Sequence, residues 1–178
     1  MSQPCTKSKC CDPCDSVVKL TRREVMAATS LGVSGGLLSS SVAQASPAAQ
    51  KPYPRIKVAD LAALKPDSTV SFNYPDDSSP ATLIRLREAA ASGVGPGNTI
   101  VAFSQLCTHK GCPVNYRPER KLMICPCHWS TFDPAKSGQM VIGQASQALP
   151  QIQLQVEAGA VFAVGVNGLI FGRHTNML

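Results

Sequence analysis

Two short segments hold four of the eight cysteines and two of the three histidines, and they constrain the fold more than any other feature of the chain. The first covers residues 107–112 and reads CTHKGC, and the second covers residues 125–130 and reads CPCHWS. Four thiols and two imidazoles are two more ligands than a tetrahedral zinc ion takes, and structural zinc usually binds closely spaced cysteine pairs. We therefore expect two loops that meet at a metal centre, with a zinc-binding module as the alternative.

The rest of the chain favours short strands over long helices. Only 5% of the residues are aromatic and 16% are charged, whereas 13 glycines and 14 prolines supply turns. β-rich runs predict strands over residues 69–74, 82–86, 99–104, 122–124, 152–156, 161–166 and 169–171. The one expected helix covers residues 58–64, and Asn167-Gly168 predicts a tight hairpin between the last two strands. The fold class is therefore all-β, an antiparallel sandwich or barrel.

The first 45 residues have the organisation of an export signal. Arg22 and Arg23 precede a largely apolar, uncharged stretch up to Val42, and the small-residue cleavage site Ala43-Gln-Ala45 follows. The paired arginines resemble the twin-arginine (Tat) signal, which exports folded proteins to the periplasm. A retained membrane anchor is the alternative, because about 18 apolar residues nearly span a bilayer. We expect a signal region over residues 1–45, a linker over 46–54 and one domain over 55–178.

Four further cysteines precede the apolar stretch, with no histidine beside them: Cys5, Cys10, Cys11 and Cys14. Cleavage of the signal would remove them, so we assign them no role in the mature protein and have no physical account of them. The formal net charge of the whole chain is +6, but its basic residues form no run and no aromatic residues interleave with them. This pattern argues against a nucleic-acid-binding surface.

The two segments together resemble the two-box signature of Rieske iron–sulfur proteins, CTHxGC followed by CPCHxS. The match is specific because six side chains fall in register across two loops. The resemblance implies one 2Fe-2S cluster, bound by the first cysteine and the histidine of each box. The implied ligands are Cys107 and Cys125 on one iron and His109 and His128 on the other. The remaining pair, Cys112 and Cys127, would then form a disulfide between the loops, which an oxidising compartment preserves.

The same resemblance singles out residues around the cluster. Ser130 keeps the hydroxyl donor of the family, and Gly111 is expected to allow a tight loop. Lys110 and Trp129 stand where quinol-oxidising cytochrome bc complexes commonly carry an apolar residue and a glycine. Phe132 stands where relatives of higher potential carry a tyrosine that donates a hydrogen bond to a ligand sulfur.

Residues 125–145 closely resemble the small subunit of bacterial arsenite oxidase. That resemblance implies a large partner subunit with molybdopterin and another iron–sulfur cluster, and a cytochrome c or azurin-like electron acceptor in the periplasm. We expect electron transfer and no substrate chemistry from this chain, because no phosphate-binding glycine loop, nucleophile elbow or mononuclear-iron triad is recognisable. The alternatives are the Rieske subunit of a cytochrome bc complex and a Rieske ferredoxin that serves an aromatic-ring oxygenase.

Overall fold

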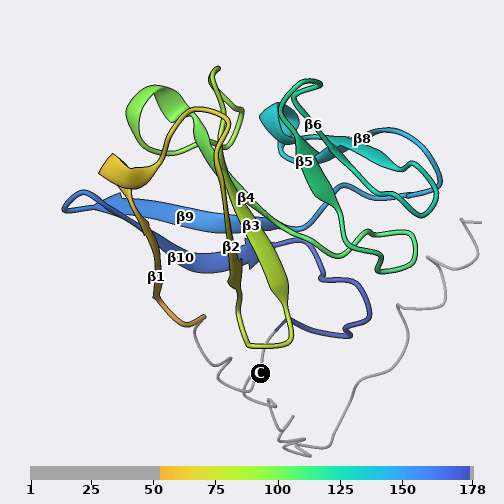
Figure 1. The fold of residues 1–178 in the computed structure, drawn as a ribbon. Helices are drawn as coiled ribbons and strands as arrows, with labels where there is room; N and C mark the ends of the chain where they lie inside the picture. Colours follow the sequence, from red (N-terminus) through yellow and green to blue (C-terminus); the bar gives the residue numbers. More distant parts are fainter. Residues whose placement is uncertain (1–52, 177–178) are drawn as a thin grey trace, which may run out of the picture. The chain divides into compact units, whose positions relative to one another are not determined.

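Two antiparallel sheets make up the part of the chain that the computed structural model describes, residues 53–176 (Figure 1). The predicted all-β fold class is therefore confirmed. Within this range no helix is long and apolar enough to cross a membrane. The predicted signal region and most of the predicted linker lie outside the described residues, and so do four cysteines: Cys5, Cys10, Cys11 and Cys14.

The larger sheet has six strands. In spatial order they are β1 (Ile56–Asp60), β10 (Ala160–Asn167), β9 (Gln151–Glu157), β4 (Ile100–Ser104), β3 (Pro80–Arg85) and β2 (Thr69–Asn73). All neighbouring pairs are antiparallel. The edge strands β1 and β2 contact each other, so the sheet is nearly closed.

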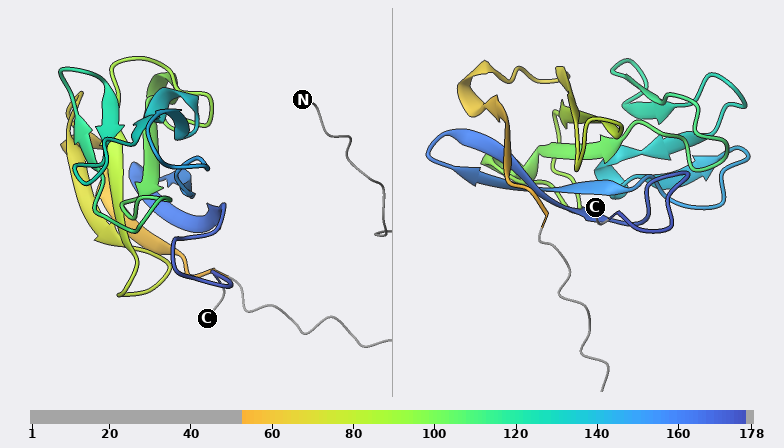
Figure 2. Two further views of the ribbon diagram at one scale, coloured as in Figure 1. Left: turned by 90° about the vertical axis from the view of Figure 1, so that its right-hand side faces the viewer. Right: turned by 90° about the horizontal axis from the view of Figure 1, so that it is seen from below.

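The smaller sheet is an insertion between two neighbouring strands of the larger one. Its strands are β5 (Asn115–Arg117), β6 (Leu122–Ile124), β7 (Thr131–Asp133) and β8 (Gln139–Ile142). The chain leaves the larger sheet after β4 and returns at β9, where the Ser104 N–H donates to the Pro150 carbonyl over 2.8 Å. The green and teal strands β5, β6 and β8 form a separate layer beside the larger sheet (Figure 1, Figure 2).

Strand β4 supplies side chains to two apolar clusters. Val101 and Phe103 pack into a cluster that the larger sheet shares with the inserted segment, whereas Ile100 and Ala102 pack into a cluster within the larger sheet. Successive side chains of a strand point to opposite faces, so a fully buried strand can serve two cores. β4 thereby joins the packing of the insertion to the packing of the larger sheet.

Six of the seven predicted strands are present with small shifts at their ends, and three local predictions are wrong. The predicted helix over 58–64 is a strand up to Asp60 followed by the 3-10 turn η1 (Leu61–Ala63), because pairing with β10 overrides the local preference. The predicted strand over 169–171 is absent, and so is the hairpin predicted at Asn167-Gly168; the tight turn at Ala158-Gly159 joins β9 to β10 instead. The side chain of Asn176 accepts the Ile170 N–H over 2.9 Å, which takes the donor that a strand partner would use.

The structure also contains elements that the sequence pattern did not reveal. Strands β5 and β7 have three residues each and β8 has four, which is too short for a clear alternation. Two further 3-10 turns are η2 (Pro96–Asn98) and η3 (Pro134–Lys136). The second of these is capped by Asp133, whose carboxylate accepts the Ala135 N–H over 2.9 Å.

Candidate metal centre

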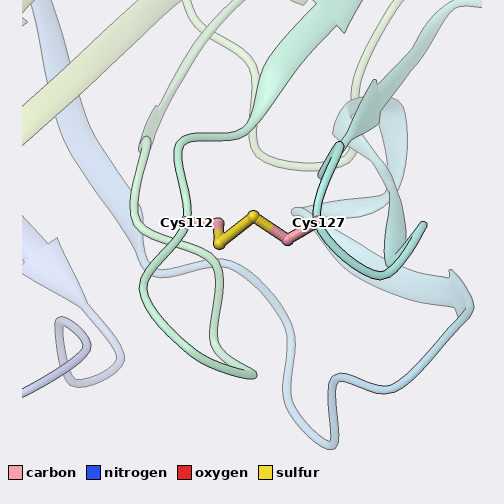
Figure 3. Close-up of a disulfide and its surroundings, with 2 residues drawn as sticks. All are labelled: Cys112 and Cys127. Atoms are coloured by element: carbon pink, nitrogen blue, oxygen red, sulfur yellow. A yellow bond between two sulfur atoms is a disulfide. The ribbon is translucent and has the colours of Figure 1, made fainter.

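Both loops that contain cysteine and histidine lie between strands of the structure. Loop 1 (residues 107–112) lies between β4 and β5, and loop 2 (residues 125–130) joins β6 to β7. The disulfide between Cys112 and Cys127 links the two loops, with the Cα atoms 6.5 Å apart (Figure 3). The cysteine pairing that the resemblance implied is therefore confirmed. The disulfide keeps the two loops next to each other, as a metal centre with ligands from both requires.

The two loops have the same backbone hydrogen bonds. In each loop the N–H of the first residue donates to the carbonyl of the sixth, over 2.9 Å in both cases. The N–H of the fifth residue donates back to the carbonyl of the first, over 2.8 Å in loop 1 and 3.1 Å in loop 2. The fifth residue has a left-handed backbone in both, with φ of 73° at Gly111 and 60° at Trp129.

The four predicted ligands offer two thiols and two imidazoles. Cys107 and Cys125 are free thiols and both are buried. The rings of His109 and His128 lie edge to face, with centroids 4.7 Å apart and planes at 82°. Within residues 53–176 the buried Nδ1 atom of His109 has no hydrogen-bond partner. An unpaired polar atom costs free energy when it is buried, so this nitrogen is suited to a metal ligand.

Three sulfur atoms lie within 4.8 Å of one another: those of Cys112, Cys125 and Cys127. Because two of them form the disulfide, Cys125 alone in this group can offer a thiolate. Cys107 supplies a second one. Burial raises the pKa of the Cys107 thiol, and backbone N–H groups of His109 and Lys110 that donate to its sulfur oppose this rise. A bound metal would reverse the effect of burial, since a coordinating thiol is deprotonated.

Ser130 connects loop 2 to the segment that follows β8. Its hydroxyl oxygen accepts hydrogen bonds from the N–H groups of Gln144 (3.1 Å) and Ala145 (3.0 Å). Two accepted bonds use both lone pairs, which leaves the hydroxyl proton available to donate. Gly143 allows the close approach, because a Cβ atom there would lie 2.4 Å from the Cα atom of Ser130. The donor role of Ser130 toward a cluster remains a prediction.

The other residues predicted to surround the cluster lie in different environments. Phe132 is fully buried in the same apolar cluster as Cys107 and Cys125. Lys110 is exposed on loop 1, next to Gly111 with its positive φ. Phe132 therefore lies in the packing around the thiols, whereas Lys110 faces solvent.

Sequence reasoning missed two contacts that hold loop 1 from outside. The Thr108 hydroxyl donates to the Gln147 carbonyl over 2.9 Å. The ring of Phe171 covers Gly111 so closely that a Cβ atom at Gly111 would lie 2.7 Å from ring atom Cδ1. The sequence pattern predicts a strand at Phe171, and it carries no signal for a contact with so distant a part of the chain.

The donor set alone does not choose the metal. With Cys112 and Cys127 joined in a disulfide, two thiols and two imidazoles remain, and these would satisfy either one zinc ion or a cluster with two irons. The spacing of the ligands favours the cluster, and comparison with known proteins provides an independent test.

Residues 55–153 match the family described as the Rieske 2Fe-2S domain. The chain is 39% identical over 148 residues to iodate reductase subunit IdrB of Pseudomonas sp. (strain SCT). The alignment covers 79% of this chain and 77% of that protein. It is 36% identical over 160 residues to the subunit of the same name in Denitromonas iodatirespirans. That alignment covers 88% of this chain and 86% of that protein.

Among solved structures, the soluble domain of the Rieske protein II (soxF) from Sulfolobus acidocaldarius is similar, with a TM-score of 0.61 and 25% identity. The similarity covers 68% of this chain and 82% of that one. The matched family is defined by a 2Fe-2S cluster, and this decides between the cluster and zinc.

Proposed function

Because this chain belongs to the Rieske 2Fe-2S family, we propose that it is the electron-transfer subunit of an exported molybdopterin oxidoreductase. The domain binds one 2Fe-2S cluster of the Rieske type. The proposed ligands are Cys107 and Cys125 on one iron and His109 and His128 on the other. When bound, such a cluster supplies one-electron transfer at a potential of roughly −150 to +300 mV.

The observation that carries the ligand assignment is the unpartnered, buried Nδ1 atom of His109 on a loop that also holds the buried free thiol of Cys107. Cys125 offers the matching thiol from the second loop, which the disulfide ties to the first. The two loops thus bring together donors of the required kind. In this proposal the chain holds and shields a redox centre, and the substrate reacts on a second subunit.

The finer proposal is that the second subunit oxidises arsenite to arsenate. It is supported by the stretch from Cys125 to Ala145, CPCHWSTFDPAKSGQMVIGQA, which resembles the small subunit of bacterial arsenite oxidase. Such a partner carries molybdopterin and a further iron–sulfur cluster and takes two electrons from each arsenite. This chain would pass them singly to a cytochrome c or an azurin-like protein. The Tat-type signal supports a periplasmic location, with membrane association if the signal is retained.

Iodate reduction is the second candidate. It is supported by the similarity to the two iodate reductase subunits over 79% and 88% of this chain. Electrons would then run in the opposite direction, from a donor through this chain to the subunit that reduces iodate. The two candidates share the cluster and a partner subunit, and they differ in the direction in which this chain passes electrons.

Lys110 argues against a quinol-oxidising cytochrome bc complex. In such complexes the tip of the first loop enters an apolar quinol pocket, and here that position carries an exposed ammonium group. Burying an unpaired charge costs several kcal/mol, so this chain would need another mode of docking.

Purification of the native assembly tests the proposal. We expect a large molybdenum-containing subunit to copurify, and arsenite added without oxygen to reduce the Rieske cluster, as followed by electron paramagnetic resonance (EPR). Iodate added to the dithionite-reduced assembly would instead reoxidise the cluster if the second candidate is correct. The isolated chain is the control and should respond to neither substrate. An assembly without molybdenum would contradict both candidates while leaving the family assignment intact.

A further inference from the structure

The segment after β10 lies on loop 1. A Cβ atom built on Gly111 would lie 2.7 and 2.8 Å from ring atoms Cδ1 and Cε1 of Phe171, distances that real side chains do not reach. The ring therefore occupies the space where any other residue at position 111 would place its side chain. Phe171 is still 38% exposed, so one part of it faces loop 1 and another part faces solvent.

The segment that carries Phe171 is anchored on both sides of the ring. The buried Asn176 donates from Nδ2 to the Gly168 carbonyl over 2.6 Å and accepts the Ile170 N–H over 2.9 Å. Ile170 itself is buried in the core of the larger sheet. These contacts close residues 168–176 into a fixed loop, which holds Phe171 in one place.

An ion pair adds a third anchor. Arg173 Nη2 lies 2.6 Å from Oδ2 of Asp76, in the turn between β2 and β3, and both side chains are less than one-fifth exposed. Burial alone would raise the pKa of Asp76, but hydrogen bonds from Ser78, Arg173 and Ser79 outweigh it and lower the pKa to about 2. The carboxylate is therefore charged at neutral pH, where it can pair with Arg173.

We infer that Phe171 is a positioning residue of the redox centre: seated on Gly111, it fixes the outer side of loop 1 and keeps water from it. The inference rests on the proposed ligands Cys107 and His109, which this loop contributes. The disulfide between Cys112 and Cys127 ties the same loop to loop 2. Phe171 and the disulfide therefore restrain loop 1 through two separate contacts.

The expected consequence concerns the reduction potential. Two ferric ions, two sulfides and two thiolates with neutral imidazoles have no net charge, and reduction adds one negative charge. Water that reaches loop 1 solvates the negative form better than the neutral one. Removing the ring should therefore raise the potential, and a looser loop should broaden the EPR lines.

The test uses the full chain with its cluster and compares three variants by voltammetry and EPR. Phe171→Ala should raise the potential and broaden the signal, whereas Phe171→Leu, which retains an apolar cover, should restore most of the wild-type behaviour. Leu169→Ala is the matched control, because Leu169 is a 47% exposed apolar residue of the same segment. A Phe171→Ala protein with the potential and linewidth of wild type would overturn the inference.

A double-mutant comparison keeps the inference testable if Phe171→Ala folds poorly. Gly111→Ala should displace the ring and shift the potential in the same direction, and Gly111→Ala with Phe171→Ala should shift it by less than the sum of the two single changes. Strictly additive shifts would show that the contact does not position the loop. A wild-type protein without a Rieske signal would instead refute the cluster assignment itself.

Discussion

Loop 1 and loop 2 close with the same two backbone hydrogen bonds, yet they differ at the one residue with a left-handed backbone. Loop 1 has Gly111 there, covered by the Phe171 ring. Loop 2 has Trp129, whose side chain is 70% exposed. A left-handed backbone costs a residue with a Cβ atom roughly 1–2 kcal/mol, and glycine avoids this cost.

This difference shows that the surroundings of a loop, and not its backbone alone, decide which residue it accepts. At Gly111 the conformation and the covering ring both exclude a side chain. At Trp129 only the conformation is unfavourable, because the residue is largely exposed; one side of it lines a cavity of ≈ 170 Å³ together with Arg120 and Pro126. Loop 1 is held from outside, and loop 2 presents an aromatic surface next to the proposed ligand His128.

The largest effect is expected from removing one thiol from either loop. If each loop contributes one thiolate ligand, Cys107→Ser and Cys125→Ser should each abolish the cluster, because each variant leaves an iron with only one thiolate. The wild-type chain should contain two irons and two acid-labile sulfides, as set by the cluster type, and give the low-g EPR signal of a reduced Rieske centre. Full signal in one variant would show that its loop supplies no ligand.

Removing the link between the loops should leave the cluster but lower the stability. The disulfide joins residues 15 apart, and closing a loop of that length stabilises a protein by about 3 kcal/mol. The double variant Cys112→Ser with Cys127→Ser should lose about that much free energy of unfolding in denaturant titrations. The double change avoids an unpaired thiol. An unchanged unfolding midpoint would show that the loops hold each other without the covalent link.

The position two residues beyond loop 2 should tune the potential. Phe132 is buried with the two free thiols, and a tyrosine hydroxyl there would donate toward a ligand sulfur and favour the more negative, reduced state. If about 1–2 kcal/mol of that bond differs between redox states, Phe132→Tyr raises the potential by roughly 40–90 mV. Phe132→Leu is the control without a donor. A potential that does not rise, in a variant whose hydroxyl is seen bonded to sulfur, would contradict this role.

The smallest effect is expected at the residue that distinguishes the two loops. Trp129→Gly relieves the left-handed strain but gives the unfolded chain more freedom, so we expect a net stabilisation of about 0.5–1 kcal/mol. Trp129→Ala is the matched control, because it removes the ring, keeps the Cβ atom and should not stabilise. Thermal unfolding of the three proteins measures the difference. Equal gains from glycine and alanine would locate the effect in the exposed ring.

Local sequence patterns predicted six of the strands, including the three-residue β6, and they failed where contacts between distant segments decide. β4 and β10 stand close to their predicted positions because five or more consecutive residues carry the pattern. The hairpin predicted at Asn167-Gly168 is absent: Asn167 still belongs to β10, only Gly168 has a positive φ (87°), and the side chain of Asn176 takes the Ile170 N–H that a following strand would use. The residues 167–171 themselves carry no pattern that predicts this hydrogen bond to Asn176.

At the site, the spacing of cysteines and histidines predicted two loops that meet, and the disulfide shows that they do, whereas the four proposed ligands stay a prediction. The disulfide followed from the family resemblance and is present. The contact of Phe171 with Gly111 and the two hydrogen bonds accepted by Ser130 could not be predicted. Both depend on how segments far apart in the chain come together, and single residues do not encode that.

The adjacent ends of the inserted segment have a consequence for how such proteins diversify. Residues 105–150 depart from and rejoin the larger sheet at one point, where Phe103 pairs with Gln151 and Ser104 bonds to Pro150. When the ends of a flexible segment are fixed, doubling its length changes the free energy of loop closure by only about 0.6 kcal/mol. The inserted segment can therefore vary in length, provided that it still covers Val101 and Phe103 and that loop 1 keeps its contact with Phe171.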